Sequence, residues 1–283
     1  MKLLGMAQAL EEQTSDALYS SLSFEERLGL LVDRESVYRD NRRLAVRLGK
    51  AKLRQNAAFE DIDFRKPRGL DRSLVVALGA GNWIRRHNNC LLTGPTGVGK
   101  SFLACAIANK ICRDGANVVY ARASRLFSDL SIAKADGSHG RRLATLARVD
   151  LLILDDWGLA PLTAEQSRDF LEILDDRYDR RSTMIVSQTP VELWHAQMPD
   201  PTIADAALDR LVHNAHRITL TGESMRKQRA VESEGHETES QALAAPVQNQ
   251  AASVTSRLQG GSPPSPLAET PLDAKGGGRL PGV

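Results

Sequence analysis

An α/β domain built on a parallel sheet is the fold class that the sequence predicts, and three observations predict it. Short apolar strands alternate with helical segments through the centre of the chain, an order that is typical of parallel sheets. A glycine-rich turn at 94–101 joins a short apolar run to a helical segment. Further along, the apolar run 151–154 ends in two carboxylates, as a buried strand does when its carboxyl end faces a ligand.

The glycine-rich turn has the spacing G-x-x-x-x-G-K-[ST], which is typical of phosphate-binding loops. It comprises Gly94, Pro95, Thr96, Gly97, Val98, Gly99, Lys100 and Ser101, and Phe102 follows in the helix. Glycines allow the backbone to turn tightly and to bring its N–H groups against phosphate oxygens. Lys100 is expected to reach the β- and γ-phosphates, and the Ser101 hydroxyl to ligate Mg²⁺. The positive end of the helix adds to the same anion site, so the turn predicts a nucleoside triphosphate.

Two carboxylates, Asp155 and Asp156, follow the apolar run. The chain between Lys100 and Asp155 leaves room for one intervening strand and its helices. We expect Asp155 to hold Mg²⁺, partly through water, and Asp156 to polarise the attacking water. Gln188 follows another short strand, and two interpretations of it stay open: a polar group beside the γ-phosphate, or ordinary turn chemistry.

The other elements follow from apolar periodicity and capping signals. Residues 1–58 lack strand signals, and Ser23 with Glu26 forms a capping box that begins a long helix. Helices are expected from Asp71 to about Gly79 and over 102–112, 124–133, 163–180 and 202–212, strands over 89–93, 118–120, 150–156, 183–187 and 215–220, and a loop over 136–140. The predicted organisation is a helical N-terminal domain at 1–58, a nucleotide-binding domain at 59–230 and a disordered, low-complexity tail at 231–283.

One stretch is strongly basic, although the whole chain carries a net charge of only +2. Between residues 34 and 54, eight basic residues stand against two acidic ones. A solvated helix face is one interpretation; a surface that contacts nucleic-acid phosphates is the other, and the concentration of charge favours it. The candidate contacts are Arg39, Arg42, Arg43, Arg47 and Lys50. Aromatic residues are only 5%, which leaves few platforms for base stacking and favours duplex DNA over single strands.

Composition excludes several other classes of protein. Three cysteines are too few for a disulfide framework, and their spacing matches no zinc pattern. Cys105 and Cys112 are expected to pack, reduced, beside small residues of one helix. No segment approaches the ~20 apolar residues that a membrane span requires. We therefore expect a soluble, cytoplasmic protein that makes no contact with a membrane.

With these residues identified, the chain resembles the IstB-like ATPases, the helper subunits of a class of bacterial transposases, which are related to the DnaC helicase loaders within the AAA+ ATPases. The likeness spans roughly residues 1–229. It rests on GMAQALEEQ (5–13), FEDIDF (59–64), GPTGVGKS (94–101), LLILDDWG (151–158), SQTPVELWH (187–195), DRLVHNAHRI (209–218) and GESMRK (222–227). Many enzymes share the phosphate loop, but the ordered set is far more specific and fits IstB-like proteins better than DnaC-type loaders.

The resemblance implies an AAA+ (RecA-like) P-loop ATPase that uses ATP and Mg²⁺. It also implies a homo-oligomer that assembles on duplex DNA and passes target sites to a partner transposase. Among matching positions, Asp155 is the metal-side acid, and Asp156 stands where a longer Glu is common. Gln188 takes the sensor position, and Arg210 is the arginine finger that acts on ATP held by a neighbouring subunit. Arg226 resembles the second sensor arginine, although little ordered chain remains after it for a full lid.

Three other functions are alternatives to a DNA-binding ATPase that regulates transposition. A DnaC-type helicase loader would keep the ATPase and act on single strands. A small-molecule kinase would need a second substrate motif, and the sequence offers none. A binding module with a degenerate nucleotide site is disfavoured because Lys100, Ser101 and Asp155 are intact.

Overall fold

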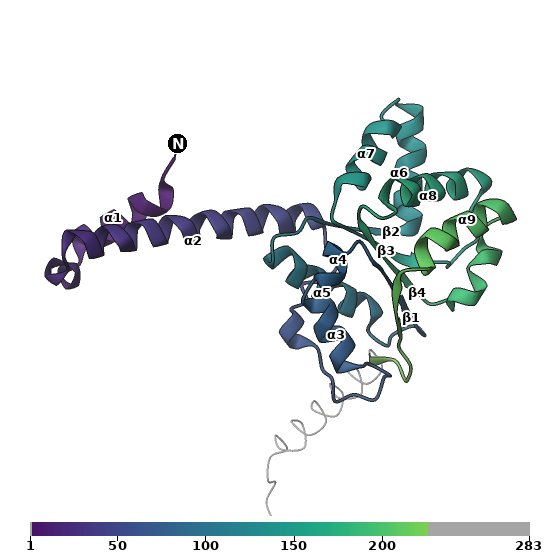
Figure 1. Cartoon of the computed structure of the whole chain (residues 1–283), viewed down its shortest axis with the longest axis horizontal. Coiled ribbons are helices and arrows are strands. Elements are labelled where there is room, and N and C mark those ends of the chain that lie inside the picture. Colours follow the sequence, from purple (N-terminus) through teal and green to yellow (C-terminus); the bar gives the residue numbers. More distant parts are fainter. Residues whose placement is uncertain (1, 226–283) are drawn as a thin grey trace, which may run out of the picture. The chain divides into compact units, whose positions relative to one another are not determined.

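The structure is a computed structural model that describes residues 2–225, and a parallel sheet of five strands forms its centre (Figure 1). The strands are β1 (Asn89–Thr93), β2 (Val118–Arg122), β3 (Leu151–Trp157), β4 (Ser182–Ser187) and β5 (Ala215–Thr219), in the order β2-β3-β4-β1-β5. Every neighbouring pair is parallel. The predicted α/β fold is therefore confirmed. The tail expected at 231–283 and Arg226 lie outside the described residues, and the domain boundaries at 58 and 230 stay predictions.

Helices cover both faces of the sheet. Successive strand residues point to opposite sides, and the apolar side chains on each side pack against helices. The paired residues Cys90, Met184 and Ile153 pack under one set of helices, and the next residues along each strand pack under the other. The first set consists of α3 (Arg72–Gly79), α4 (Asn82–Arg85) and α5 (Lys100–Arg113); the second of α6 (Ala123–Ala135), α7 (His139–Arg148), α8 (Ala164–Arg177) and α9 (Pro201–Val212) (Figure 1). Short 3-10 turns occupy Phe59–Asp61 (η2), Val191–Leu193 (η3) and His195–Gln197 (η4).

Two helices precede this core: α1 (Leu4–Ser15) and α2 (Phe24–Ala51), joined through the 3-10 turn η1 (Ala17–Ser21). The capping box at the start of α2 is present, since the Ser23 and Glu26 side chains each accept the other's backbone N–H. Gly5 lets α1 approach α2 closely, because a Cβ there would lie 2.7 Å from Cβ of Tyr38. Glu35 is buried and accepts hydrogen bonds from the backbone N–H groups of Gly5 and Met6. The two helices thus form an antiparallel pair along the N-terminal part of α2 (Figure 1).

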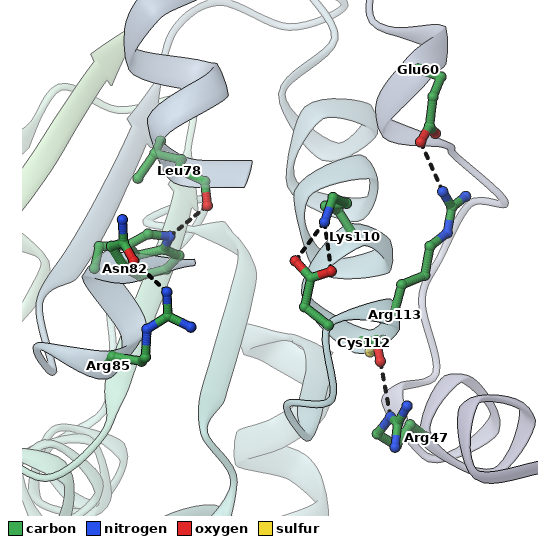
Figure 2. Close-up of polar contacts among 10 residues, drawn as sticks. Arg47, Glu60, Leu78, Asn82, Arg85, Lys110, Cys112 and Arg113 are labelled. Atoms are coloured by element: carbon green, nitrogen blue, oxygen red, sulfur yellow. Dashed lines mark hydrogen bonds and ion pairs between the residues drawn. The ribbon is translucent and has the colours of Figure 1, made fainter. Parts of the chain in front are cut away.

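The last turns of α2 are attached to α5. Arg47 donates from Nε to the backbone oxygen of Cys112, at 2.9 Å, near the end of α5 (Figure 2). Arg113, one residue further, pairs with Glu60 of η2 at 2.9 Å (Figure 2). Ala51, the final residue of α2, is fully buried in the same core as α5. The segment between α2 and η2 is therefore held against the helix that follows the phosphate loop.

Two expected boundaries were wrong. The loop expected over 136–140 ends early, because α7 begins at His139 and buries Leu143 and Leu146 in the core. The helix expected to reach residue 180 ends at Arg177, since Asp179 adopts a left-handed conformation with φ +53°. Strand β3 includes both carboxylates, as expected, and ends one residue later, at Trp157. Between residues 2 and 225, none of the helices combines the length and hydrophobicity that a membrane crossing requires.

Candidate nucleotide-binding site

A cavity of about 390 Å³ lies where β3 and β4 end and α5 begins. Carboxyl ends of parallel strands are the usual location of ligand sites in open α/β sheets, and this volume is in the range of small-molecule pockets. Its walls include both carboxylates, Gln188 and much of the phosphate loop. The lining residues are Arg54, Gln55, Asp61, Asp63, Lys66, Arg68, Thr96, Gly97, Gly99, Lys100, Ser101, Phe102, Asp155, Asp156, Val186, Ser187, Gln188 and Met225.

Two glycines of the phosphate loop are required by the chain that crosses it after β5. Gly94 has φ +144°, and a Cβ on it would lie 2.2 Å from the backbone oxygen of Leu220. Gly97 has φ +88°, and its Cβ would lie 2.1 Å from Oγ of Ser224. The backbone N–H of Met225 donates to the oxygen of Gly97 at 2.9 Å, which fixes the crossing segment in place. The loop can therefore keep this shape only with glycine at both positions.

Lys100 begins α5 and is buried, with 8% of its surface exposed. Its Nζ donates to the backbone oxygens of Gly94 at 2.6 Å and Pro95 at 2.7 Å. Burial lowers the pKa of Lys100, although attraction by Asp155 and Asp156 opposes that shift. The ammonium group is thus held over the loop, where phosphate oxygens can replace the carbonyls as acceptors.

The two carboxylates lie on the same side of β3, although adjacent strand residues should point to opposite faces. The pairing between β3 and β4 shifts register between Leu154 and Trp157, which marks a β-bulge. Asp156 takes φ +59°, a left-handed conformation that aspartate tolerates better than most residues. Both carboxylates consequently line the cavity. The β-bulge and the left-handed Asp156 therefore bring the two carboxylates to the same side of the strand. The sequence pattern does not predict this irregularity of the backbone.

Hydrogen bonds fix the carboxylate of Asp155, which is 1% exposed. Tyr120 of the neighbouring strand β2 donates its hydroxyl to Oδ2, and the backbone N–H of Asp156 donates to Oδ1 at 2.8 Å. Burial, followed by the hydrogen bond and the charge of Asp155, raises the pKa of Tyr120, so the phenol stays protonated and remains the donor. Tyr120 was missed by sequence reasoning, which treated it only as part of an apolar strand.

Gln188 lies directly after β4, the strand between β1 and β3. Its Oε1 accepts a hydrogen bond from the Thr96 hydroxyl of the phosphate loop. The strand order therefore brings this amide between the loop and the acidic pair. Of the two interpretations left open for Gln188, the geometry favours a group beside the phosphates.

The remaining predicted nucleotide contacts differ in where they lie. Thr96, Gly97, Gly99, Ser101 and Phe102 line the cavity together with Lys100. Val98 is buried beneath the loop, while Gly94 and Pro95 hold Lys100 through their carbonyls. Arg226 lies outside the described residues.

Arg210 is not part of the cavity. It lies in the last turn of α9, where its guanidinium forms an ion pair with Asp175 of α8 and donates to the backbone oxygen of Ala206 at 2.8 Å. The structure therefore does not bring Arg210 to Asp155 or Asp156 of its own chain. Its expected action on a neighbouring subunit's nucleotide stays a prediction.

Sequence reasoning missed a wall of the cavity that comes from the segment between α2 and α3. Arg68 is only 4% exposed and donates to the backbone oxygens of Val98 at 3.2 Å and Asp63 at 3.1 Å. Burial lowers the pKa of Arg68, and Asp63 opposes that shift. Arg54 reaches the acidic pair from the same segment. The motif FEDIDF at 59–64 marked this segment as characteristic, but without a chemical role.

A parallel sheet in this strand order, with a phosphate loop after β1 and an acidic pair on β3, defines a P-loop ATPase of the AAA+ class. A family model described as "IstB-like ATP binding protein" matches residues 1–233. The chain belongs to this family.

Two relatives agree with the family. A "putative insertion sequence ATP-binding protein" of Sinorhizobium fredii is 55% identical over 227 residues, which cover 80% of this chain and 93% of the relative. A second, the "putative ATP-binding protein" of an insertion sequence of Pseudomonas fluorescens, is 52% identical over 67% of this chain and 83% of its own length.

Solved structures support the fold. The crystal structure of DnaI is similar with a TM-score of 0.52 and 22% identity, over 59% of this chain and 92% of that one. The replication initiator DnaA, bound to AMPPCP and single-stranded DNA, is similar with a TM-score of 0.51 and 17% identity, over 66% of this chain and 57% of that one. At these identities the likeness is one of fold alone.

Proposed function

We propose that this chain is a helper ATPase of insertion-sequence transposition, which assembles on duplex DNA and delivers target sites to a partner transposase. One observation carries the proposal: the phosphate loop and the acidic pair meet in a single cavity, in a chain of the IstB-like family. The relatives named for insertion sequences support the setting in transposition.

In this proposal the loop binds ATP and the acids promote its hydrolysis. Backbone N–H groups of the loop and Nζ of Lys100 bind the phosphates. The Ser101 hydroxyl and the Asp155 carboxylate provide the oxygen ligands that Mg²⁺ prefers, and the metal, when bound, neutralises charge on the phosphates. Asp156, 23% exposed at its side chain, accepts a proton from the attacking water. Gln188 orients groups near the γ-phosphate through its contact with Thr96.

Two arginines complete the proposed machinery, Arg210 of α9 and Arg226, which lies beyond the described residues. Arg210 acts across a subunit interface, because it lies apart from the nucleotide site of its own chain. Leaving its pair with Asp175 would free the guanidinium for a neighbour's γ-phosphate. Arg226 serves as the second sensor. Such roles require a homo-oligomer, which we propose forms on DNA.

The proposed DNA surface is a groove on α2. Arg39, Arg42, Arg43 and Arg47 border a hollow of about 450 Å³ between α2 and the turn at Gly115–Asn117. We call these four residues the basic groove. Lys50 lies one turn beyond it and is exposed.

Not every charge of the basic groove is free for phosphate. Arg39 pairs with Glu35 at 2.7 Å, Arg43 pairs with Asp40 at 3.2 Å, and Arg47 holds the end of α5. Arg42 and Lys50 are exposed, and no carboxylate between residues 2 and 225 pairs with either. We therefore expect Arg42 and Lys50 to contribute most to DNA affinity, and Arg47 least.

The proposal is tested by the steady-state ATPase rate without DNA, with duplex DNA and with single-stranded DNA of equal length. We expect hydrolysis in all three and a higher rate with the duplex. Equal stimulation by single strands would favour a helicase-loader function. An ATPase rate that is the same with and without DNA would contradict the proposed role on DNA.

The DNA surface has its own test. Replacing Arg42, Arg43 and Lys50 by Gln should weaken duplex binding for all sequences alike and flatten its salt dependence by about 0.9 in log–log slope per lost phosphate contact. Fluorescence anisotropy at several salt concentrations measures both. The matched control replaces Arg85 at the end of α4, Arg86 directly after it and Arg113 at the end of α5 by Gln, which removes the same charge. An equal effect of the two triple variants would contradict the assignment of the surface to α2.

A further inference from the structure

A buried arginine in the wall of the cavity has no acidic partner among the described residues. Arg68 is only 4% exposed, and its guanidinium donates to the backbone oxygens of Val98 at 3.2 Å and Asp63 at 3.1 Å. Its Nη1 also lies 3.3 Å from the sulfur of Met225. Its Nε is buried without a hydrogen-bond acceptor, and no carboxylate between residues 2 and 225 forms an ion pair with it. The charge of Arg68 is therefore removed from water without a counter-ion.

Burial of an unpaired charge costs free energy, because carbonyls and a thioether compensate it less well than a carboxylate does. Burial accordingly lowers the pKa of Arg68, and the charge of Asp63 only opposes that shift. The Asp63 carboxylate itself pairs with the exposed Arg65, at 3.4 Å. An anion that enters the cavity would supply the counter-charge that Arg68 lacks and would offset this cost.

Arg68 lies directly against the phosphate loop. A Cβ on Gly99 would lie 2.7 Å from Nη1 of Arg68, and Val98, whose carbonyl accepts from the same nitrogen, is the residue before Gly99. Lys100, the residue after Gly99, is buried as well, and both cations line the cavity. Two buried cations beside one short turn of chain favour a ligand that carries several negative charges.

The position of Arg68 along the loop indicates which phosphates it serves. Loops of this type surround the α- and β-phosphates with backbone N–H groups, and their lysine reaches the β- and γ-phosphates. The acids Asp155 and Asp156, which the proposed function assigns to the metal and the attacking water, pair with Arg54 and not with Arg68. Arg68 is therefore the cation on the loop side of the cavity, and Arg54 is the cation on the acid side.

We propose that Arg68 is a nucleotide-binding residue, which neutralises the α- and β-phosphates beside Val98 and Gly99. The inference deepens the proposed function and rests on it, since it presumes a nucleotide in this cavity. ATP and ADP share these two phosphates. Arg68 therefore strengthens the binding of both nucleotides by the same factor and does not discriminate between them.

The experiment measures the binding of ATP and of ADP to the full-length chain by isothermal titration calorimetry, in EDTA so that ATP is not hydrolysed. Arg68→Met removes the charge and keeps a long apolar side chain. It should weaken the binding of both nucleotides by about 10- to 100-fold, the range for a hydrogen bond that involves a charged group. Arg68→Lys keeps the charge but loses the fork that reaches two carbonyls, and it should recover most of the affinity.

Arg68→Gln provides the test if the methionine variant does not fold. It is neutral and keeps a donor for one carbonyl, so it should bind both nucleotides as weakly as Arg68→Met. The matched control is Arg65→Met, which removes an equal charge from the same segment. The Arg65 side chain is 94% exposed and does not line the cavity, so both affinities should equal the parent's.

Three results would overturn the inference and leave the proposed function standing. The first is parent-like affinity in the neutral variants. The second is an Arg68→Lys chain that binds as weakly as Arg68→Met while its circular dichroism matches the parent's, because Arg68 would then only brace the loop through its carbonyl contacts. The third is a loss confined to ATP, which would place the charge at the γ-phosphate. A parent chain that binds neither nucleotide would overturn both proposals.

Discussion

The phosphate loop and the acidic pair face each other across one cavity, yet they are held in different ways. The loop keeps its shape through its own glycines and through backbone contacts with the segment at 220–225. The acidic pair depends on a β-bulge and on side chains from elsewhere, Tyr120 of β2 and Arg54 after α2. Changes in the loop should therefore act on nucleotide binding and stability, whereas changes around the acids should act on turnover.

The largest expected effect concerns Arg210, and it tests whether the ATP site needs a residue from a neighbouring subunit. Arg210→Ala should bind ATP but lose turnover by on the order of 10³–10⁵, the contribution of an arginine finger to phosphoryl transfer. Mixing it with Lys100→Ala should partly restore the rate, because one subunit supplies the intact arginine and the other the intact site. Steady-state turnover across mixing ratios measures the rescue.

A control separates this role from a structural one. Asp175→Asn removes the ion pair of Arg210 but keeps the arginine. If Arg210 is an arginine finger, Asp175→Asn should hydrolyse ATP at the parent's rate. Equal losses in the two variants, or no rescue in a mixture whose co-assembly is verified, would mean that Arg210 serves only the packing of α8 and α9.

The next effect concerns the loop. Lys100→Ala should weaken ATP binding by about 10- to 100-fold, since a hydrogen bond to a charged group contributes about 1.5–3 kcal/mol. Titration with a fluorescent ATP analogue measures it. Affinity equal to the parent's would show that the cavity is not where the phosphates bind.

A third prediction sharpens the claim that the loop is set by backbone geometry. Gly97→Ala places a Cβ against Ser224 at a φ of +88° and should destabilise the fold by about 1–3 kcal/mol. Urea unfolding measures the change. The control is Gly140→Ala in α7, where nothing lies within 4 Å of the added Cβ and helix propensity favours alanine by roughly 0.5–1 kcal/mol. Equal stability of the two variants would contradict the geometric account of the loop.

A fourth effect, comparable in size, concerns the support of the acids. Tyr120→Phe removes the hydroxyl that donates to Asp155 and should cost about 1–3 kcal/mol of stability, because a buried carboxylate oxygen loses its hydrogen bond. Chemical denaturation gives this figure, and turnover should change while ATP affinity does not. An equal change in ATP affinity and in turnover would contradict the claim that the loop governs binding and the acids govern turnover.

The same difference explains what the sequence could predict. The loop is local: Gly94, Lys100 and Ser101 stand within a few residues, so their spacing alone indicated their chemistry. The acids were found as a pair, but their common orientation needs a left-handed Asp156 and a register shift, which no periodicity announces.

Partners from distant segments escaped prediction for a related reason. Arg54 was counted only among the basic residues of the N-terminal region, and its contact with the acids arises from the turn at Lys52. Arg47 donates to the Cys112 carbonyl of α5, a partner that the sequence pattern did not indicate, and its contact with phosphates stays a prediction. The sequence shows that such residues are charged, but which group each side chain contacts depends on tertiary packing.

The most direct test of the account uses Asp156→Asn. Asparagine tolerates the left-handed conformation of this residue, so the substitution removes the proposed base and keeps the backbone. The measurement is ATP affinity and single-turnover hydrolysis, made on the same preparation. The account predicts affinity close to the parent's and hydrolysis slower by about 10²–10⁴-fold, the usual contribution of a general base. Hydrolysis at the parent's rate would contradict the assignment of Asp156 as the base that activates water in this cavity.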